Sequence, residues 1–164
     1  MGLSMRLTIQ GDQAIERRLG RLADRLGDLT PLMSILASFL RASTRQRFED
    51  GEGPDGARWT PSIRARLTGG KTLVQHGILR DSINDQHGRN HAVVGTNDPR
   101  ARMLHFGGVI TARAGGALVF NLPGAGWRRV ASVTIPPRPF VGLSTADGVE
   151  IGGLIDDYIA RSVA

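Results

Sequence analysis

The sequence predicts an α+β fold, with helices at both ends of the chain and antiparallel strands between them. Near both termini, apolar residues recur every three or four positions, which is the period of an amphipathic helix. The middle of the chain instead contains short runs rich in β-branched residues, separated by glycine-rich turns, which is typical of antiparallel strands. Helices and strands that are segregated along the chain in this way are characteristic of α+β domains.

The first elements are a short strand and an amphipathic helix. Residues 6–10 alternate between polar and apolar side chains, which predicts the strand. Gly11 and Asp12 then offer a helix N-cap, and the helix is expected to stop near Gly27. Its apolar stripe has the spacing i, i+4, i+7 and i+11 and consists of Ile15, Leu19, Leu22 and Leu26.

A second helix follows after a short connection. Thr30 is expected to be its N-cap, with Pro31 at the first helical position, where a missing backbone N–H costs nothing. Its wide apolar face consists of Leu32, Ile35, Leu36, Phe39 and Leu40. Two helices joined by a short loop form an antiparallel helical hairpin, so residues 1–50 are predicted to be a strand plus this hairpin.

Residues 51–138 are predicted to be a basic α+β core. Pro54-Asp55-Gly56 is a turn sequence, and Thr60-Pro61 repeats the cap-plus-proline pattern of a helix start. The elements expected here are a short helix over 62–67, a strand or turn and then helical turns within 73–83, a buried strand over 92–95, and a helical segment that Asp98 caps and Gly107 and Gly108 end.

A protruding β-hairpin is predicted within this core. Gly115 and Gly116 form a two-residue turn signal between the apolar runs 109–114 and 117–120. Residues 122–127 are expected to be a loop, and 130–135 a final strand.

Residues 139–164 are predicted to complete a proline-stiffened strut and form the C-terminal amphipathic helix. A length of 164 residues is typical of one domain, so residues 1–164 are predicted to form a single domain. Pro136, Pro137 and Pro139 fix the backbone and remove three donors, which excludes both a helix and a central strand. The strut therefore delivers Arg138 and Phe140 to set places. The helix after it is expected to be capped by Asp147, with an apolar face of Ile151, Leu154, Ile155, Tyr158 and Ile159.

Composition excludes several classes of protein. The chain has no cysteine, so it has neither a disulfide framework nor a thiolate site, and no apolar run approaches the roughly 20 residues of a membrane span. The formal net charge of +6 arises in the middle, because residues 1–57 are neutral, residues 58–138 carry +9 and residues 139–164 carry −3. This division suggests either two opposed surfaces for acidic and basic partners, or a solvated arginine-rich surface.

Sequence patterns typical of catalytic or metal-binding sites are weak, so we expect that the protein is not an enzyme and binds neither a cofactor nor a metal. His87 and His91 with Asp85 have the spacing of a helical metal site, but their segment reads as a loop. His76 and His105 are expected to be packed side chains. Residues 65–72 come within one residue of a phosphate-binding loop, yet alanine replaces its first glycine and no strand precedes it.

Nucleic-acid binding is a stronger candidate. Arginine contacts phosphate without reading sequence, whereas only 5% of the residues are aromatic, which is poor for stacking on bases. Several of the arginines that could contact DNA or an acidic partner lie on or next to the predicted hairpin. The full set, which clusters in sequence, is Arg100, Arg102, Arg113, Arg128 and Arg129.

Five sequence blocks follow one another in a specific order, at Phe48 with 54–61, at 73–83, at 93–97, at 106–108 and at 135–144. In these blocks and their order the chain resembles the virion morphogenesis, or tail completion, proteins of Mu-like and related tailed bacteriophages. The chain departs from the family pattern at 100–101 and 104–105. The matching residues to which we assign assembly or structural roles are Phe48, Trp59, Gly77, Leu79, Ser82, Phe106, Gly107, Gly108, Arg138, Pro139 and Phe140.

The resemblance implies a non-enzymatic protein of the head–tail junction, made in the bacterial cytoplasm and built into the virion. It implies a ring of identical copies, expected to be a hexamer, around the DNA channel. Its partners would be the tail tube protein, head-side connector proteins and the genomic DNA, and not a membrane. The arginine-rich hairpin would then line or approach the channel, while Trp59 and Phe140 would anchor the fold or a subunit contact. The alternative is a non-specific double-stranded-DNA-binding protein.

Overall fold

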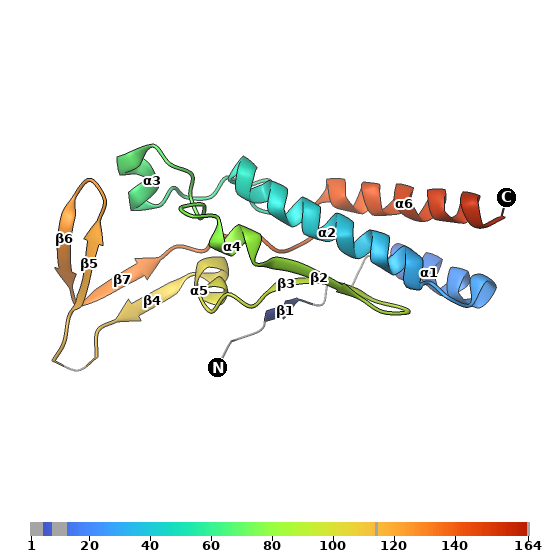
Figure 1. Cartoon of the computed structure of the whole chain (residues 1–164), viewed down its shortest axis with the longest axis horizontal. Coiled ribbons are helices and arrows are strands. Elements are labelled where there is room, and N and C mark those ends of the chain that lie inside the picture. Colours follow the sequence, from blue (N-terminus) through green and yellow to red (C-terminus); the bar gives the residue numbers. More distant parts are fainter. Residues whose placement is uncertain (1–4, 8–12, 114, 164) are drawn as a thin grey trace.

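The computed structural model describes residues 5–7, 13–113 and 115–163. The molecule is elongated, with a helical layer over a small sheet at one end and a β-arm at the other (Figure 1). Helices and antiparallel strand pairs occur together, which confirms the predicted α+β fold with helices at both ends of the chain. A β-hairpin does protrude from the body, but it is formed by other strands than those predicted. None of the described helices is both long and apolar enough to cross a bilayer.

The helical layer consists of α1 (Gln13–Leu26), α2 (Thr30–Asp50) and α6 (Thr145–Val163), and all three were predicted. Their apolar stripes meet in one cluster, because a helix with one apolar face must bury it against another element. The buried members of this cluster are Leu22, Leu29, Leu32, Met33, Leu36, Ile151 and Ile155.

The helix starts differ in detail from the expectation. Thr30 is the first helical residue rather than the N-cap, and the Asp28 carboxylate accepts hydrogen bonds from its backbone N–H and its hydroxyl. At α6 the predicted cap Asp147 lies inside the helix, where it exchanges hydrogen bonds with Ser144 in a capping box. The cap predicted at Gly11 and Asp12 lies outside the described residues.

Beneath α2 lies a three-stranded antiparallel sheet of β1 (Met5–Leu7), β3 (Ala92–Thr96) and β2 (Ile83–His87), in that order. The buried strand over 92–95 is confirmed, whereas the loop predicted for the segment of His87 and His91 is confirmed only at 88–91, because residues 83–87 form a strand. Residues 83–87 are polar at most positions, and they form a strand because they pair along the whole length of β3. Of the first predicted strand, residues 8–10 lie outside the described residues.

Three short helices connect the two ends of the molecule. They are α3 (Ile63–Thr68), α4 (Ile78–Asp81) and α5 (Ala101–Phe106), all at predicted places. The N-cap of α3 is Ser62, whose hydroxyl accepts a hydrogen bond from the Ala65 N–H at 3.1 Å.

The β-arm consists of β4 (Gly108–Thr111), β5 (Leu118–Leu122), β6 (Gly126–Val130) and β7 (Ser132–Ile135). β4 pairs with β7, and β5 pairs with β6. The predicted hairpin across Gly115 and Gly116 is therefore wrong. The loop predicted over 122–127 is confirmed only at 123–125, which form the hairpin turn between Leu122 and Gly126. A local glycine pair marks a turn but does not choose the pairing partner of the strand before it.

Candidate assembly interface

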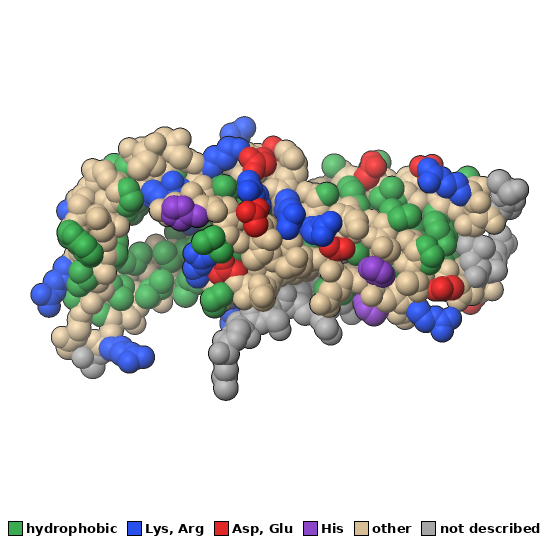
Figure 2. All heavy atoms as spheres, in the orientation of Figure 1, with side chains coloured by type: hydrophobic (Ala, Val, Ile, Leu, Met, Phe, Trp, Pro, Cys, Tyr) green, Lys and Arg blue, Asp and Glu red, His purple; other side chains and the backbone are tan. Residues whose placement is uncertain are grey.

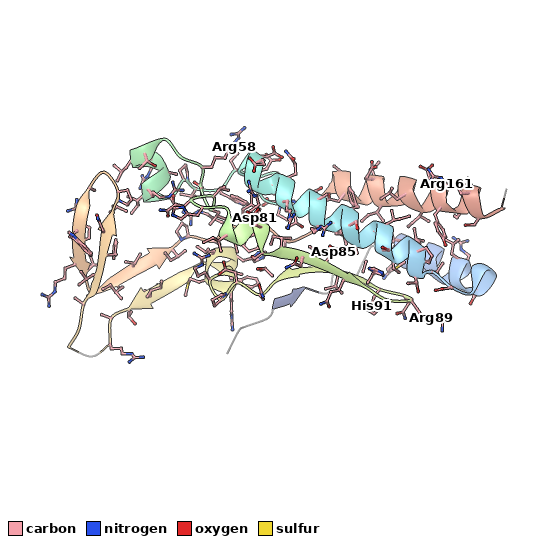
Figure 3. All side chains as sticks on the ribbon, viewed as in Figure 1. Arg58, Asp81, Asp85, Arg89, His91 and Arg161 are labelled. Atoms are coloured by element: carbon pink, nitrogen blue, oxygen red, sulfur yellow. The ribbon has the colours of Figure 1, made fainter. Side chains whose placement is uncertain are left out.

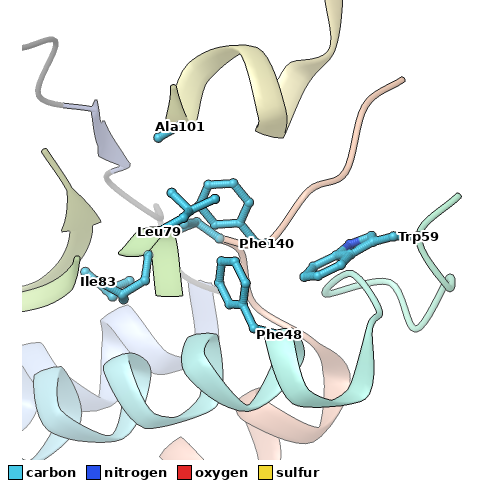
Figure 4. Packing of buried hydrophobic residues seen from close by; sticks show 8 residues of the cluster. Phe48, Trp59, Leu79, Ile83, Ala101 and Phe140 are labelled. Atoms are coloured by element: carbon cyan, nitrogen blue, oxygen red, sulfur yellow. The ribbon is translucent and has the colours of Figure 1, made fainter. Parts of the chain in front are cut away.

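Four of the residues predicted to have assembly or structural roles meet where the helical body joins the β-arm. Phe48, Trp59, Leu79 and Phe140 belong to one buried cluster with Ile83 and Ala101 (Figure 4). The ring of Phe48 packs edge-on against Trp59, with ring centres 5.5 Å apart, and lies 5.3 Å from the ring of Phe140. Trp59 and Phe140 are thus placed in the core of the subunit, and an aromatic cluster of this size fixes the joint by apolar burial.

The proline strut is held by hydrogen bonds to the segments on both sides of it. The Trp59 indole N–H donates to the Pro139 carbonyl at 2.8 Å. The Arg138 backbone N–H donates to the carbonyls of α5, and its side-chain Nε donates to the Thr60 carbonyl at 2.8 Å. Arg138 is buried, and burial lowers the pKa of its guanidinium. The strut therefore connects α5, the loop before α3 and the core.

His105 is buried in the joint, as predicted, whereas His76 is exposed, so the packed position predicted for His76 is wrong. Nδ1 of His105 accepts a hydrogen bond from the Phe140 N–H at 3.3 Å, and its ring packs edge-on against Phe140. Burial lowers the pKa of His105, so the neutral imidazole fits this site.

Three smaller motif residues have backbone or hydrogen-bonding roles. Gly107 has φ +71°, and a Cβ atom there would lie 2.7 Å from the Pro137 nitrogen, so only glycine fits. Gly77 has φ +72° and precedes α4. The Ser82 hydroxyl donates to the Leu79 carbonyl and lies 2.6 Å from the Thr96 hydroxyl, which links α4 to the sheet. Phe106, in contrast, is 58% exposed and lies on the surface.

The two faces of the β5–β6 ribbon differ in character. Directly opposite residues of an antiparallel pair share a face, so Val119 with Arg129 and Asn121 with Trp127 make up one face. Trp127 is 71% exposed and Val119 is 60% exposed. We call these four residues the outer face of the arm. An aromatic side chain exposed to this degree beside an arginine is typical of a protein–protein interface.

The opposite face of the arm closes over a hollow against the body, visible in Figure 2. The hollow has a volume of about 390 Å³ and is lined by apolar side chains from α3, α4 and both ribbons, which include Ile63, Ile78, Phe120, Leu122 and Ile135. The turn at Gly124 lies close to Leu67 of α3, so the arm bends back toward the body.

The predicted arginines are spread along this end of the chain and are all exposed. Arg128 and Arg129 lie on β6, Arg113 in the turn after β4, and Arg102 on α5. Arg100 differs, because it forms a bidentate ion pair with Asp98, with Nη2 2.6 Å from Oδ2. This hydrogen bonding lowers the pKa of Asp98, and it neutralises the charge of Arg100 locally.

A cleft lined by carboxylates lies between the C-terminal end of α2 and the N-terminal end of α6. Its volume is about 620 Å³, and its acidic lining residues include Asp50, Glu52, Asp55 and Glu150. None of these four forms a salt bridge with a described residue. We call it the acidic cleft. It was not predicted as a site, although its acids cluster in sequence at 49–55.

The weaker sequence candidates do not assemble into sites. His87 lies on β2 and His91 near the turn of the β2–β3 hairpin, rather than on one helix (Figure 3). The carboxylate of Asp85 is 2.9 Å from Arg41 and is neutralised by it. Within the residues that the structure describes, no three metal-ligating side chains gather. Around 65–72, α3 ends where a phosphate-binding loop would need its helix to begin.

Comparison with known proteins decides the family. A model of the phage virion morphogenesis family matches residues 10–160. The chain belongs to this family. A relative in Haemophilus influenzae, Mu-like prophage FluMu G protein 2, is 32% identical over 93% of this chain and 94% of its own length. A second relative, from Escherichia phage Mu, has the printed name putative capsid assembly protein G and is 27% identical over 90% of this chain and 92% of its own length. No solved structure matches the chain significantly.

In this virion morphogenesis protein, Phe48, Trp59, Leu79 and Phe140 are buried in one core cluster, and Gly107 packs the base of the arm against the proline strut. As a member of this family, the protein has a structural role in the assembly of phage particles.

Proposed function

We propose that the protein completes the phage tail and helps to join it to the head, as a ring of identical copies around the DNA channel at the head–tail junction. In this proposal it is not an enzyme, it is made in the host cytoplasm, and the ring is a hexamer. Its direct neighbours are the tail tube protein or the head-side connector proteins.

The observation that carries this proposal is the β-arm itself. A single copy cannot bury the outer face, where Trp127 is 71% exposed, so the face is suited to another protein. An arm at one end that docks on a different surface of the next copy makes a heterologous contact, and such contacts generate closed rings when the rotation permits. Family membership agrees with an assembly role, since the relatives match along nearly their whole length.

The direct test removes the gene from the phage and images the particles by electron microscopy. We expect full heads and tails that are separate, or tails with aberrant ends, and we expect the wild-type gene supplied in trans to restore joined particles. Normal particles without the protein would contradict the proposal. Images of the purified protein should in turn show rings, from which the number of subunits is counted.

A second candidate function is non-specific binding of double-stranded DNA. The observation that favours it is that residues 99–146 contain six arginines and no acidic residue. Such binding weakens steeply with salt, because it releases counterions from the phosphates. Titration of a duplex DNA probe with the protein at about 50 mM and about 200 mM salt measures how the affinity depends on salt and so tests this candidate.

A further inference from the structure

We propose that the outer face of the arm, with Trp127 and Arg129 at its centre, docks into the acidic cleft of a second copy of this chain. This inference rests on the proposed function, in which copies assemble, and it specifies which two surfaces meet.

Charge complementarity supports the choice of a second copy as the partner. The arm lies within a stretch of the chain, residues 99–146, that has no carboxylate of its own. Arg129 has no salt bridge to a described residue. The acidic cleft is lined by carboxylates and offers no free cation among its described lining residues, since its one buried cation, Arg47, is already paired with Asp147. Each surface therefore lacks the charge that the other presents.

The shapes of the two surfaces also fit. The arm offers one large aromatic side chain and one arginine from a narrow two-stranded ribbon, and these residue types dominate the energetics of protein interfaces. The cleft of about 620 Å³ is within the size range of pockets that enclose a ligand. Its lining includes apolar Phe39 and Pro54 as well as the carboxylates, so it can receive both the indole and the guanidinium.

A copy cannot make this contact with itself. The turn of its own arm lies against α3, and Figure 1 shows β5 and β6 at the far end of the molecule from most of α6. The contact must therefore join different surfaces of two copies, and it leaves one free arm and one free cleft in every dimer. Addition of further copies then continues until the ring closes.

The composition of the outer face favours a protein over DNA. Of its four residues only Arg129 is charged, and Trp127 and Val119 present an apolar surface. A surface that follows a phosphate backbone instead places rows of arginine or lysine against it.

The test uses two matched variants of the full chain. Arg129→Glu reverses the charge on the outer face, whereas Arg128→Glu makes the same change on the opposite face of the same strand. Trp127→Ala removes the aromatic anchor. Analytical ultracentrifugation measures the self-association constant of each variant. We expect R129E and W127A each to weaken self-association at least tenfold, and R128E to change it less than threefold. All three positions are exposed, so circular dichroism should show an unchanged fold.

A mixing experiment then identifies the partner surface. A double variant that combines Asp55→Arg and Glu150→Arg should self-associate weakly, as R129E does, because its cleft and its arm are then both positive. When this protein is mixed with R129E, the negative arm of one meets the positive cleft of the other, and complexes should form again.

Failure of association to return on mixing would overturn the assignment of the cleft, as would wild-type association by R129E or a wild-type protein that stays monomeric at all concentrations. Unchanged association with loss of duplex DNA binding in R129E would assign the arm to DNA instead. A wild-type protein that stays monomeric would also count against the ring in the proposed function. The other results bear only on which surfaces meet, and the defect of particles without the gene is tested separately.

Discussion

The guanidinium of Arg47 on α2 forms a buried ion pair with the carboxylate of Asp147 on α6. Their side chains are only 8% and 7% exposed. Burial lowers the pKa of Arg47. Burial alone would raise the pKa of Asp147, but hydrogen bonds from Ser43 and Ser144 and the charge of Arg47 bring it below its usual value. The pair joins the C-terminal helix to the helical hairpin beside the acidic cleft.

Asp147→Asn should destabilise the protein by about 3 kcal/mol or more, because it leaves the Arg47 charge buried without its partner. Urea unfolding measures this change in free energy. The control is Asp157→Asn on the exposed side of the same helix, which should change stability by less than about 0.5 kcal/mol. Equal effects of the two substitutions would show that the pair contributes nothing specific.

The same pair predicts a loss of stability in acid. Since the folded pKa of Asp147 is lowered, its contribution is complete above the unfolded value of about 3.9 and disappears as the pH falls through the folded pKa. Thermal melts between about pH 5 and pH 2 should show a smaller decline in D147N than in the wild type.

His105 predicts a second pH dependence at a higher pH. Because burial lowers its folded pKa, the unfolded chain takes up the proton first, and stability falls as the pH drops below about 6.5. His105→Gln cannot take up this proton and should flatten the stability profile between about pH 7 and pH 5. A slope that persists in H105Q would assign the effect to another group.

Two of the three phenylalanines in the family blocks, Phe106 and Phe140, should differ strongly in how much stability their truncation costs. Phe140→Ala empties a fully buried position and should cost about 3 to 5 kcal/mol. Phe106→Ala removes a ring that is 58% exposed and should cost less than about 1 kcal/mol. Denaturant unfolding of both variants checks this contrast, and a large loss in F106A would show that its edge-on contact with the ring of His105, with ring centres 4.5 Å apart, contributes more stability than its exposure indicates.

Gly107→Ala tests the close approach of the arm base to the strut. The added Cβ atom would lie 2.7 Å from the Pro137 nitrogen at a φ of +71°, so strain and clash together should cost roughly 2 kcal/mol or more. Gly56 has a similar φ of +75° with nothing within 4 Å, so Gly56→Ala should cost about 1 kcal/mol from strain alone. Thermal denaturation of the pair separates the two contributions.

The helices were predictable because their determinants are local. In α1, the apolar stripe of Ile15, Leu19 and Leu22 lies within a few turns of Gly27, near which the helix ends. The spacing of these residues in the sequence is therefore enough to predict the helix. Strand pairing is not local. β4 pairs with β7, more than twenty residues away. The glycine pair 115–116, from which a different pairing partner was predicted, lies in the segment between these two strands.

The candidate site divides in the same way. The sequence identified the family, because the resemblance depends on residue type and order, and the roles assigned to its motif residues and arginines stay predictions. It did not identify the acidic cleft, whose members come from residues 50–55 and from α6 and meet only in the folded chain.

The sequence by itself thus determined the helices, the rigidity of the proline strut and the separation of charge along the chain, since each depends on neighbouring residues. Only the tertiary structure decided that Phe140 is buried while Phe106 is exposed, and that Trp127 lies on an outer face. The physical reason is that burial depends on which distant segment packs against a side chain, and strand register and helix packing set that together.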